Sequence, residues 1–266
     1  RDCLLSRGLG DVYKRQHIYL GIKILSGVLY HPLQIKMSIQ GDAAKNEGRN
    51  RRMLDKVIEN NRVTIIGEVV SDFTYSHEVF GEGFYMVDIA VNRLSNSVDI
   101  IPLMVSERLV DVTEDYRGMI IEATGQFRSY NRHEENHNRL VLSIFAREFA
   151  VAEETQEATN TNQIFLDGYI CKPPVYRKTP LGREIADILI AVNRPYGKSD
   201  YIPCIAWGRN ARYAAGFKIG EHIRIWGRVQ SREYTKKLDE DTQIKRTAYE
   251  VSVSKIECVD EDNEQE

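Results

Sequence analysis

The sequence contains one domain-sized repeat, and this repeat limits the folds that the chain can adopt. Residues 89–93 (Ile-Ala-Val-Asn-Arg) recur as residues 190–194, 101 positions further along the chain. More identities follow the same diagonal, with a slip of one residue in the last two: Gly67 with Gly168, Asp99 with Asp200, Ile101 with Ile202, Pro102 with Pro203, Gly125 with Gly227 and Ser129 with Ser231. Identities at one spacing over this length indicate two copies of a single domain.

The repeat divides the 266-residue chain into two domains. Residues 151–162 are polar and contain no aromatic residue, so we predict that they link a domain of residues 53–150 to a domain of residues 163–258. Residues 259–266 are predicted to be an acidic tail, because most of them are Asp or Glu.

The first 52 residues are predicted to be a non-native or disordered leader. Residues 1–16 resemble a translated vector junction, and residues 45–52 are types whose codons can be purine-rich, as in a ribosome-binding site. We therefore expect the native protein to begin at Met53. The alternative is a basic, disordered arm that helps to bind nucleic acid.

Both copies are predicted to consist mostly of strands, because β-branched and aromatic residues cluster in short runs between Gly, Pro and Asn. In the second copy, we expect strands over residues 164–171, 184–192, 201–207, 222–234 and 247–258. Residues 209–217 predict a short helix between the third and fourth strands, closed by Gly216 and Gly220. This layout is typical of the OB-fold, a five-stranded Greek-key barrel. We expect an all-β chain of two tandem OB-folds, each with a short helix between strands 3 and 4.

Charge is unevenly distributed, although the net charge is only −3. Residues 63–150 contain 7 basic and 14 acidic residues, whereas residues 163–236 contain 13 basic and 6 acidic residues. An anionic partner is therefore expected on the second copy. The longest apolar stretch, residues 18–30, is too short to span a bilayer, and the four cysteines are widely spaced. We expect a cytoplasmic protein without membrane contact.

Four motifs of the second copy resemble the bacterial single-stranded DNA-binding protein family. They are LDGYI, TPLGREIADILIAVNRP, DYIPCIAWGR and GEHIRIWGRVQSREY, which reproduce the family's strand motifs in order. The first copy has similar strand motifs in the same order but lacks the Trp-Gly-Arg signature. The resemblance is to tandem members of the primosomal replication protein N type. It implies non-enzymatic, largely sequence-independent binding of single-stranded DNA in replication, repair or recombination.

The alternation of side chains along a β-strand predicts which residues of the second copy bind single-stranded DNA. In residues 222–234, positions 223, 225, 227 and 229 take the core face, which leaves Arg224, Trp226, Arg228, Arg232 and Tyr234 on the other face with Gln230. Bases stack on aromatic rings while Arg and Lys contact phosphates. The resemblance implies that Trp207 is the principal stacking residue and that Tyr201 and Tyr234 are two others. The remaining candidates are basic: Arg177, Lys178, Arg183, Arg194, Lys198, Arg209, Arg212, Lys236 and Lys237. For Trp226, packing at a barrel end or subunit interface is the alternative.

One motif is typical of a zinc enzyme but lies in the wrong context. His133, Glu134 and His137 satisfy the H-E-x-x-H pattern, which binds zinc when it lies on a helix. Here strand-like sequence lies on both sides and Asn131, Asn136 and Asn138 are interspersed, so we predict a polar hairpin loop instead. The sequence also lacks a phosphate-binding glycine loop, a nucleophile elbow and a paired-carboxylate cleft. We expect no enzymatic activity, no metal and no cofactor.

The acidic first copy is expected to bind DNA weakly, because its carboxylates repel phosphates. We expect it to serve assembly, and a degenerate duplicate kept for stability is the alternative. The resemblance implies a homodimer, which would supply four OB-folds, and replication or repair proteins as possible partners. The acidic tail, however, lacks the hydrophobic tip that recruits them. Two alternatives to DNA binding stay open: a protein-interaction module of the primosome, and RNA as the main ligand.

Overall fold

The structure is a computed structural model that describes residues 60–95, 97–134, 137–152, 161–237 and 243–259. Asp55–Tyr130 and Val141–Glu266 together form one compact unit, which contains both copies of the repeat. Arg1–Leu54 and Asn131–Leu140 form the other, of which the structure describes only ends of two paired strands. The predicted leader and residues 260–266 of the acidic tail lie outside the described residues.

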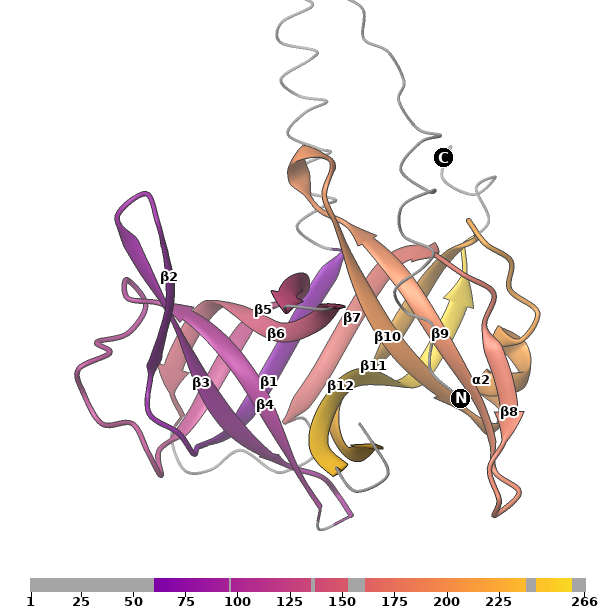
Figure 1. The fold of residues 1–266 in the computed structure, drawn as a ribbon, viewed down its shortest axis with the longest axis horizontal. Helices are drawn as coiled ribbons and strands as arrows, with labels where there is room; N and C mark the ends of the chain where they lie inside the picture. Colours follow the sequence, from indigo (N-terminus) through magenta and orange to yellow (C-terminus); the bar gives the residue numbers. More distant parts are fainter. Residues whose placement is uncertain (1–59, 96, 135–136, 153–160, 238–242, 260–266) are drawn as a thin grey trace, which may run out of the picture. The chain divides into compact units, whose positions relative to one another are not determined.

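The first copy is a closed barrel of strands (Figure 1). Its strands are β1 (Asn61–Val69), β2 (Thr74–Val79), β3 (Glu82–Asn92), β4 (Val98–Ser106), β5 (Ile120–Glu134) and β6 (His137–Val151). They follow the order β2-β3-β4-β6-β5-β1, and a further antiparallel pairing between β3 and β1 closes the sheet. β4 and β6 are parallel. Apart from the added edge strand β2, this is the Greek-key order expected from the sequence.

The second copy repeats this arrangement. Its elements are β7 (Asn162–Ile170), β8 (Val175–Lys178), β9 (Glu184–Asn193), the 3-10 helix η3 (Pro195–Gly197), β10 (Ser199–Trp207), α2 (Gly208–Ala214), β11 (His222–Lys237) and β12 (Gln243–Cys258). The order is β7-β11-β12-β10-β9-β8, closed by pairing of β7 with β9. The five strands expected from the sequence are confirmed. The short edge strand β8 was not expected, because all four of its residues are exposed and show no alternation.

Each barrel encloses an apolar core built from alternate strand positions. The largest fully buried side chains are Ile65, Ile89, Ile101, Leu103, Ile121, Phe127 and Ile144 in the first copy and Leu166, Ile170, Ile190, Ile202 and Ile223 in the second. In β11 the predicted alternation is confirmed, since Ile223, Ile225 and Val229 are 0% exposed.

The repeated glycines mark places where two strands approach closely. A Cβ atom on Gly67 would lie 2.4 Å from the carbonyl oxygen of Ala90, and one on Gly168 would lie 2.3 Å from that of Ala191. Both contacts join the first strand of a copy to the strand that closes its barrel. Only a residue without a side chain permits this approach, which explains why both copies have glycine here.

The helix expected between the third and fourth strands of each copy is present in the second copy alone, within the described part of the chain. In the first copy, residues 107–119 form turns, so that prediction is wrong. The Asp111 carboxylate accepts hydrogen bonds from the backbone N–H of Thr113 (3.0 Å) and from its hydroxyl (2.6 Å), and Asp115 accepts one from the N–H of Arg117 (3.0 Å). Such short-range bonds compete with helix formation. No described helix is long and apolar enough to cross a membrane.

The two barrels are joined by an antiparallel strand pair that the sequence did not predict. β1 pairs with β7 from Asn61 opposite Leu166 to Ile65 opposite Asn162, so the strands of both copies form a single twelve-stranded sheet. Polar side chains also join the copies. We call this set the interbarrel clasp: Arg93, Asp99 and Ser129 of the first copy, and Arg194, Asp200 and Ser231 of the second.

In the interbarrel clasp, the aspartate of each copy makes the same bonds to its own copy and to the other. Asp200 accepts hydrogen bonds from Arg194 (2.7 Å) of its own copy and from the backbone N–H of Ser129 (2.6 Å) of the other. Asp99 likewise accepts bonds from the arginine of its own copy and from the N–H of Ser231 (2.7 Å). Both aspartate side chains are only 1% exposed. The clasp residues are identical in the two copies, and they make equivalent contacts.

Candidate nucleic-acid interface

Trp207 lies at the junction of strand β10 and helix α2. The residue is 39% exposed, and Gly208 turns the chain into the helix with a φ of +54°, a conformation that glycine adopts readily. Ile185 lies directly opposite Trp207, and Arg177 lies opposite Ile185 on the next strand. An aromatic ring and a guanidinium therefore share one row on the outer face of the barrel, where they can stack on a base and contact a phosphate.

The same face of β10 presents Tyr201 near the other end of the strand. Ile202, Cys204 and Ala206 point into the core, with at most 3% exposure, whereas Tyr201 is half-buried and Trp207 is exposed. Alternation along the strand predicts Tyr201, Pro203, Ile205 and Trp207 on the outer face, and the structure agrees except at Ile205, which is only 6% exposed. The two rings lie six residues apart on one strand, far enough for a nucleic acid to contact both only with several nucleotides.

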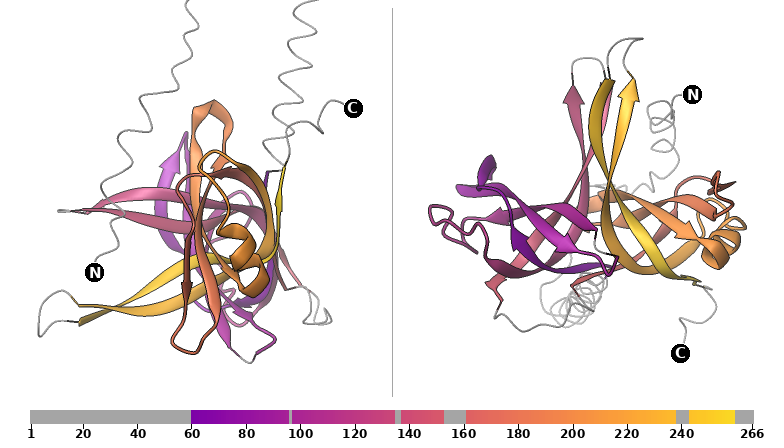
Figure 2. Two further views of the ribbon diagram at one scale, coloured as in Figure 1. Left: turned by 90° about the vertical axis from the view of Figure 1, so that its right-hand side faces the viewer. Right: turned by 90° about the horizontal axis from the view of Figure 1, so that it is seen from below.

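Strands β11 and β12 continue past the barrel as a two-stranded ribbon (Figure 2). Tyr234 is 39% exposed on this ribbon and lies opposite Arg246. The sequence analysis did not select Arg246, whose only signal is its position opposite a predicted stacking residue. Lys236 and Lys237 lie at the end of β11, but their side chains lie outside the described part of the structure.

Trp226 packs within the sheet surface. Its ring centroid lies 5.2 Å from that of Phe165, and the Nζ atom of Lys255 lies 4.4 Å from it. Trp226 and Phe165 line a groove of about 710 Å³ together with Arg62. Packing on Phe165 and Lys255 accounts for the position of Trp226, and its role in DNA binding stays a prediction.

Six of the predicted arginines form ion pairs with carboxylates, which offsets part of their charge. The pairs are Arg177 with Asp187, Arg194 with Asp200, Arg212 with Glu184, Arg224 with Asp167, Arg228 with Asp99 and Arg232 with Glu250, at N–O distances from 2.7 to 3.7 Å. Four other predicted residues are exposed and make no ion pair with a described residue: Lys178, Arg183, Lys198 and Arg209.

Two of the paired arginines belong to the junction between the copies. Arg194 donates a hydrogen bond to the carbonyl oxygen of Ser129 (2.9 Å) as well as pairing with its own Asp200. Arg228 pairs with Asp99 of the first copy (3.3 Å), and burial lowers its pKa. These contacts assign both arginines a structural role, and a role in DNA binding stays a prediction.

Gln230 and Arg232 differ in exposure, although both were expected on the outer face of β11. Gln230 is only 7% exposed and donates a hydrogen bond to Glu250 (2.8 Å). The Arg232 side chain is 58% exposed and lies 3.7 Å from the same carboxylate. β11 is therefore covered at Gln230, whereas Arg232, nearer the ribbon end, is open to solvent.

The first copy has no aromatic residue at the positions equivalent to the predicted stacking residues. Ile100, Ser106, Thr124 and Arg132 replace Tyr201, Trp207, Trp226 and Tyr234, respectively. Ser106 is 7% exposed and its hydroxyl donates a hydrogen bond to Glu82. At this place the first copy has a buried hydrogen bond instead of an exposed ring.

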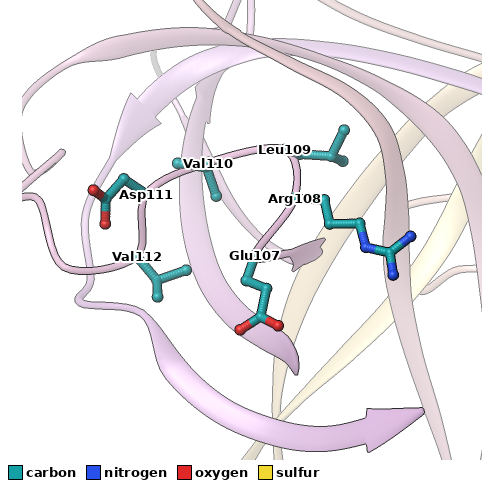
Figure 3. A pocket seen from close by; sticks show the side chains of 6 residues that line it. All are labelled: Glu107, Arg108, Leu109, Val110, Asp111 and Val112. Carbon is teal, nitrogen blue, oxygen red and sulfur yellow. The ribbon is translucent and has the colours of Figure 1, made fainter. Parts of the chain in front are cut away.

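The turn that replaces the helix in the first copy lines a pocket of about 540 Å³ (Figure 3). Its lining is six consecutive residues: Glu107, Arg108, Leu109, Val110, Asp111 and Val112. With two carboxylates and one guanidinium, the pocket has a net negative charge that disfavours phosphate.

The H-E-x-x-H segment lies between two paired strands. β5 extends to Glu134 and β6 begins at His137, so the strands reach further into this segment than the predicted loop allowed. Residues 135 and 136 and the side chains of this segment lie outside the described residues. The absence of a metal site there stays a prediction.

The second copy matches the model of a known protein family. Residues 161–259 match the model of the Single-strand binding protein family. The match begins one residue before β7 and ends one residue after β12, so it includes every strand of the second copy. The second copy is therefore similar to the single-strand binding protein family over its whole length.

Curated relatives carry the same family resemblance. Single-stranded DNA-binding protein 3 of Listeria innocua is 38% identical over 80 residues, which is 27% of this chain and 50% of the relative. Single-stranded DNA-binding protein A of Bacillus subtilis is 36% identical over 80 residues, or 27% of this chain and 46% of the relative. The chain thus spans about half the length of these curated relatives.

Solved structures extend the likeness to both copies. The wild-type single-stranded DNA binding protein from Thermus aquaticus has a TM-score of 0.61 and 17% identity, with 75% of this chain and 93% of that chain covered. A deletion mutant of the same protein has a TM-score of 0.59 and 18% identity, with 77% and 97% covered. Coverage of three quarters of this chain includes strands of both copies, so both belong to the shared fold.

Proposed function

We propose that this protein binds single-stranded DNA, largely independently of base sequence, on the outer face of the second barrel. The observation that carries the proposal is the exposed ring of Trp207, which the glycine turn holds at the end of β10 in one row with Arg177. The family of this barrel and the names of its relatives support the same ligand.

Binding would use two kinds of contact. Trp207, Tyr201 and Tyr234 would stack on bases, and every base offers a flat face, so stacking tolerates any sequence. The exposed basic side chains that make no ion pair within the described part of the chain would contact phosphates: Lys178, Arg183, Lys198 and Arg209. No bond is made or broken in this process, and the protein would protect strands during replication, repair or recombination without catalysis.

A homodimer of this chain would bring four barrels together and lengthen the surface available to one strand. Light scattering after gel filtration tests this assembly. A mass of two chains is expected, and the mass of a single chain would exclude the dimer.

The binding proposal is tested by titrating fluorescently labelled oligo-dT with the full chain over a series of salt concentrations. Four to six phosphate contacts predict a slope of about −3 to −4 for log K against log salt, from about −0.7 per contact. Trp207→Ala should weaken binding by about 1 to 3 kcal/mol, the usual contribution of one stacked base.

Tyr75→Ala is the matched control, because it removes a 58% exposed ring from the first barrel. It should bind like the wild type. A dissociation constant no tighter than millimolar would reject strand binding and favour a protein-interaction module. Tighter binding of oligo-U than oligo-dT would make RNA the main ligand.

A further inference from the structure

A strand of the first barrel lies against the start of β10, where the second barrel presents Tyr201. The backbone N–H of Tyr201 donates a hydrogen bond to the Ser129 hydroxyl (2.7 Å). Ser129 in turn donates from its own N–H to Asp200 (2.6 Å) and accepts a bond from Arg194 at its carbonyl oxygen (2.9 Å). These contacts place the middle of β5 directly beside the backbone at the start of β10.

The neighbours of Ser129 on β5 can reach a strand bound at this place. Ser129 is buried (5% exposed), and alternation along a strand directs Arg128 and Tyr130 to the opposite side of β5. Tyr130 is 39% exposed, as are Trp207 and Tyr234. Because consecutive Cα atoms are about 3.8 Å apart, Tyr130 begins close to the backbone of Tyr201.

Positive charge at this place exceeds negative charge. Burial, followed by the nearby charge of Arg194, lowers the pKa of Arg128 to about 10, and Arg147 acts in the same direction. Among these groups only Asp200 carries a negative charge. The Nε atoms of Arg128 and Arg194 are buried without a hydrogen-bond partner. Three guanidiniums around one carboxylate leave a net positive charge that favours an anion.

The equivalent place on the other side of the molecule has a smaller excess, because Arg93, Arg228 and Arg232 face two carboxylates there, Asp99 and Glu250. There, Gln230 replaces Arg128, Ile100 replaces Tyr201, and Glu250 adds a second carboxylate near the pair of Arg93 and Asp99. The two sides are related by the repeat, but among the described residues the β5 side has the larger excess of positive charge and also the exposed ring of Tyr130. The strand would therefore follow one side of the junction between the barrels.

We propose that a DNA strand bound on the second barrel continues onto β5 and β6 of the first, where Tyr130 stacks on a base and Arg128 and Arg147 bind its phosphates. This inference rests on the proposed function and extends it. The first copy, which lacks stacking residues of its own at the equivalent positions, would complete the binding face of the second.

Two substitutions in the full chain test the inference in the oligo-dT assay. Tyr130→Ala should weaken binding about fivefold or more, as loss of one stacked base does. Arg128→Gln should make the salt slope less negative by about 0.7, because one phosphate contact is lost. Glutamine occupies the equivalent position of the second copy, so the barrel fold accommodates it.

The controls remove similar side chains of the first barrel away from β5. Tyr75→Ala removes an exposed ring, and Arg108→Gln removes a guanidinium that is 71% exposed; both should bind like the wild type. Melting temperatures of all variants, compared with the wild type, separate a binding defect from loss of the fold.

A second measurement uses the wild-type chain alone. An oligo-dT that carries 5-iodouracil should photo-cross-link to Tyr130 as well as to residues of the second barrel, which peptide mass spectrometry would locate. If the wild type binds and Trp207→Ala is weakened, but both β5 variants bind normally without a Tyr130 cross-link, the inference is wrong and the proposed function stands. If the wild type does not bind oligo-dT, both fail.

Discussion

Asp200→Ala tests whether the interbarrel clasp stabilises the protein. The Asp200 side chain is 1% exposed and accepts bonds from Arg194 (2.7 Å) and the N–H of Ser129 (2.6 Å). Burial raises the pKa of Asp200, but without its carboxylate the N–H of Ser129 would stay buried and unpaired, and Arg194 would lose its counter-charge and keep only its bond to the Ser129 carbonyl oxygen. Breaking a buried ion pair in this way costs about 3 to 5 kcal/mol. At about 2 to 4 °C per kcal/mol for a protein of this size, the melting temperature should fall by about 6 to 20 °C.

The assay is thermal and urea unfolding of the full chain followed by circular dichroism. Asp187→Ala is the matched control, because Asp187 also pairs with an arginine of the second copy, at 3.0 Å, but with side-chain exposures of 51% and 45%. Exposed pairs contribute about 1 kcal/mol or less, so this variant should melt close to the wild type. If Asp200→Ala were no less stable than Asp187→Ala, the clasp would not hold the barrels together.

Two further outcomes follow from the packing. Gly168→Ala should lower the urea midpoint strongly, because its Cβ atom would lie 2.3 Å from the Ala191 carbonyl oxygen; an unchanged midpoint would show that the closing strands can separate without cost. Burial raises the pKa of the Cys171 thiol to about 11, so the thiolate that reacts is scarce at pH 8. Alkylation of Cys171, followed by peptide mass spectrometry, should accelerate with pH up to about 11 and should lag behind that of the exposed Cys258. Equal rates at pH 8 would contradict this burial.

The strands of the second copy could be predicted because their burial alternates with a period of two residues. β9 and β10 bury every second side chain over most of their length, although Ile185 and Ile205 are buried as well, and this pattern is visible as alternating apolar residues. The missed strand β8 has no buried face, so no periodic signal marks it. The wrong helix in the first copy came from transferring the second copy's helix to a segment whose Asp111 and Asp115 favour turns.

The sequence predicted on which strand face the candidate site residues lie, but not which carboxylates pair with the arginines. Alternation on β10 placed Tyr201 and Trp207 on the outer side, as the structure does. The carboxylates that pair with the arginines come from neighbouring strands or from the other copy, as Asp187 and Asp99 do for Arg177 and Arg228. Those partners depend on strand register and on the junction between barrels, neither of which a local pattern encodes.

The sequence by itself determined that the chain contains two copies of one barrel and that Arg93, Asp99 and Ser129 recur in the second copy. It also determined the Trp-Gly step that exposes Trp207. Only the tertiary structure decided that the recurring polar residues join the copies and that β5 lies beside Tyr201. The physical reason is that these bonds link groups more than 60 residues apart, and such groups meet only after both barrels have closed and β1 has paired with β7.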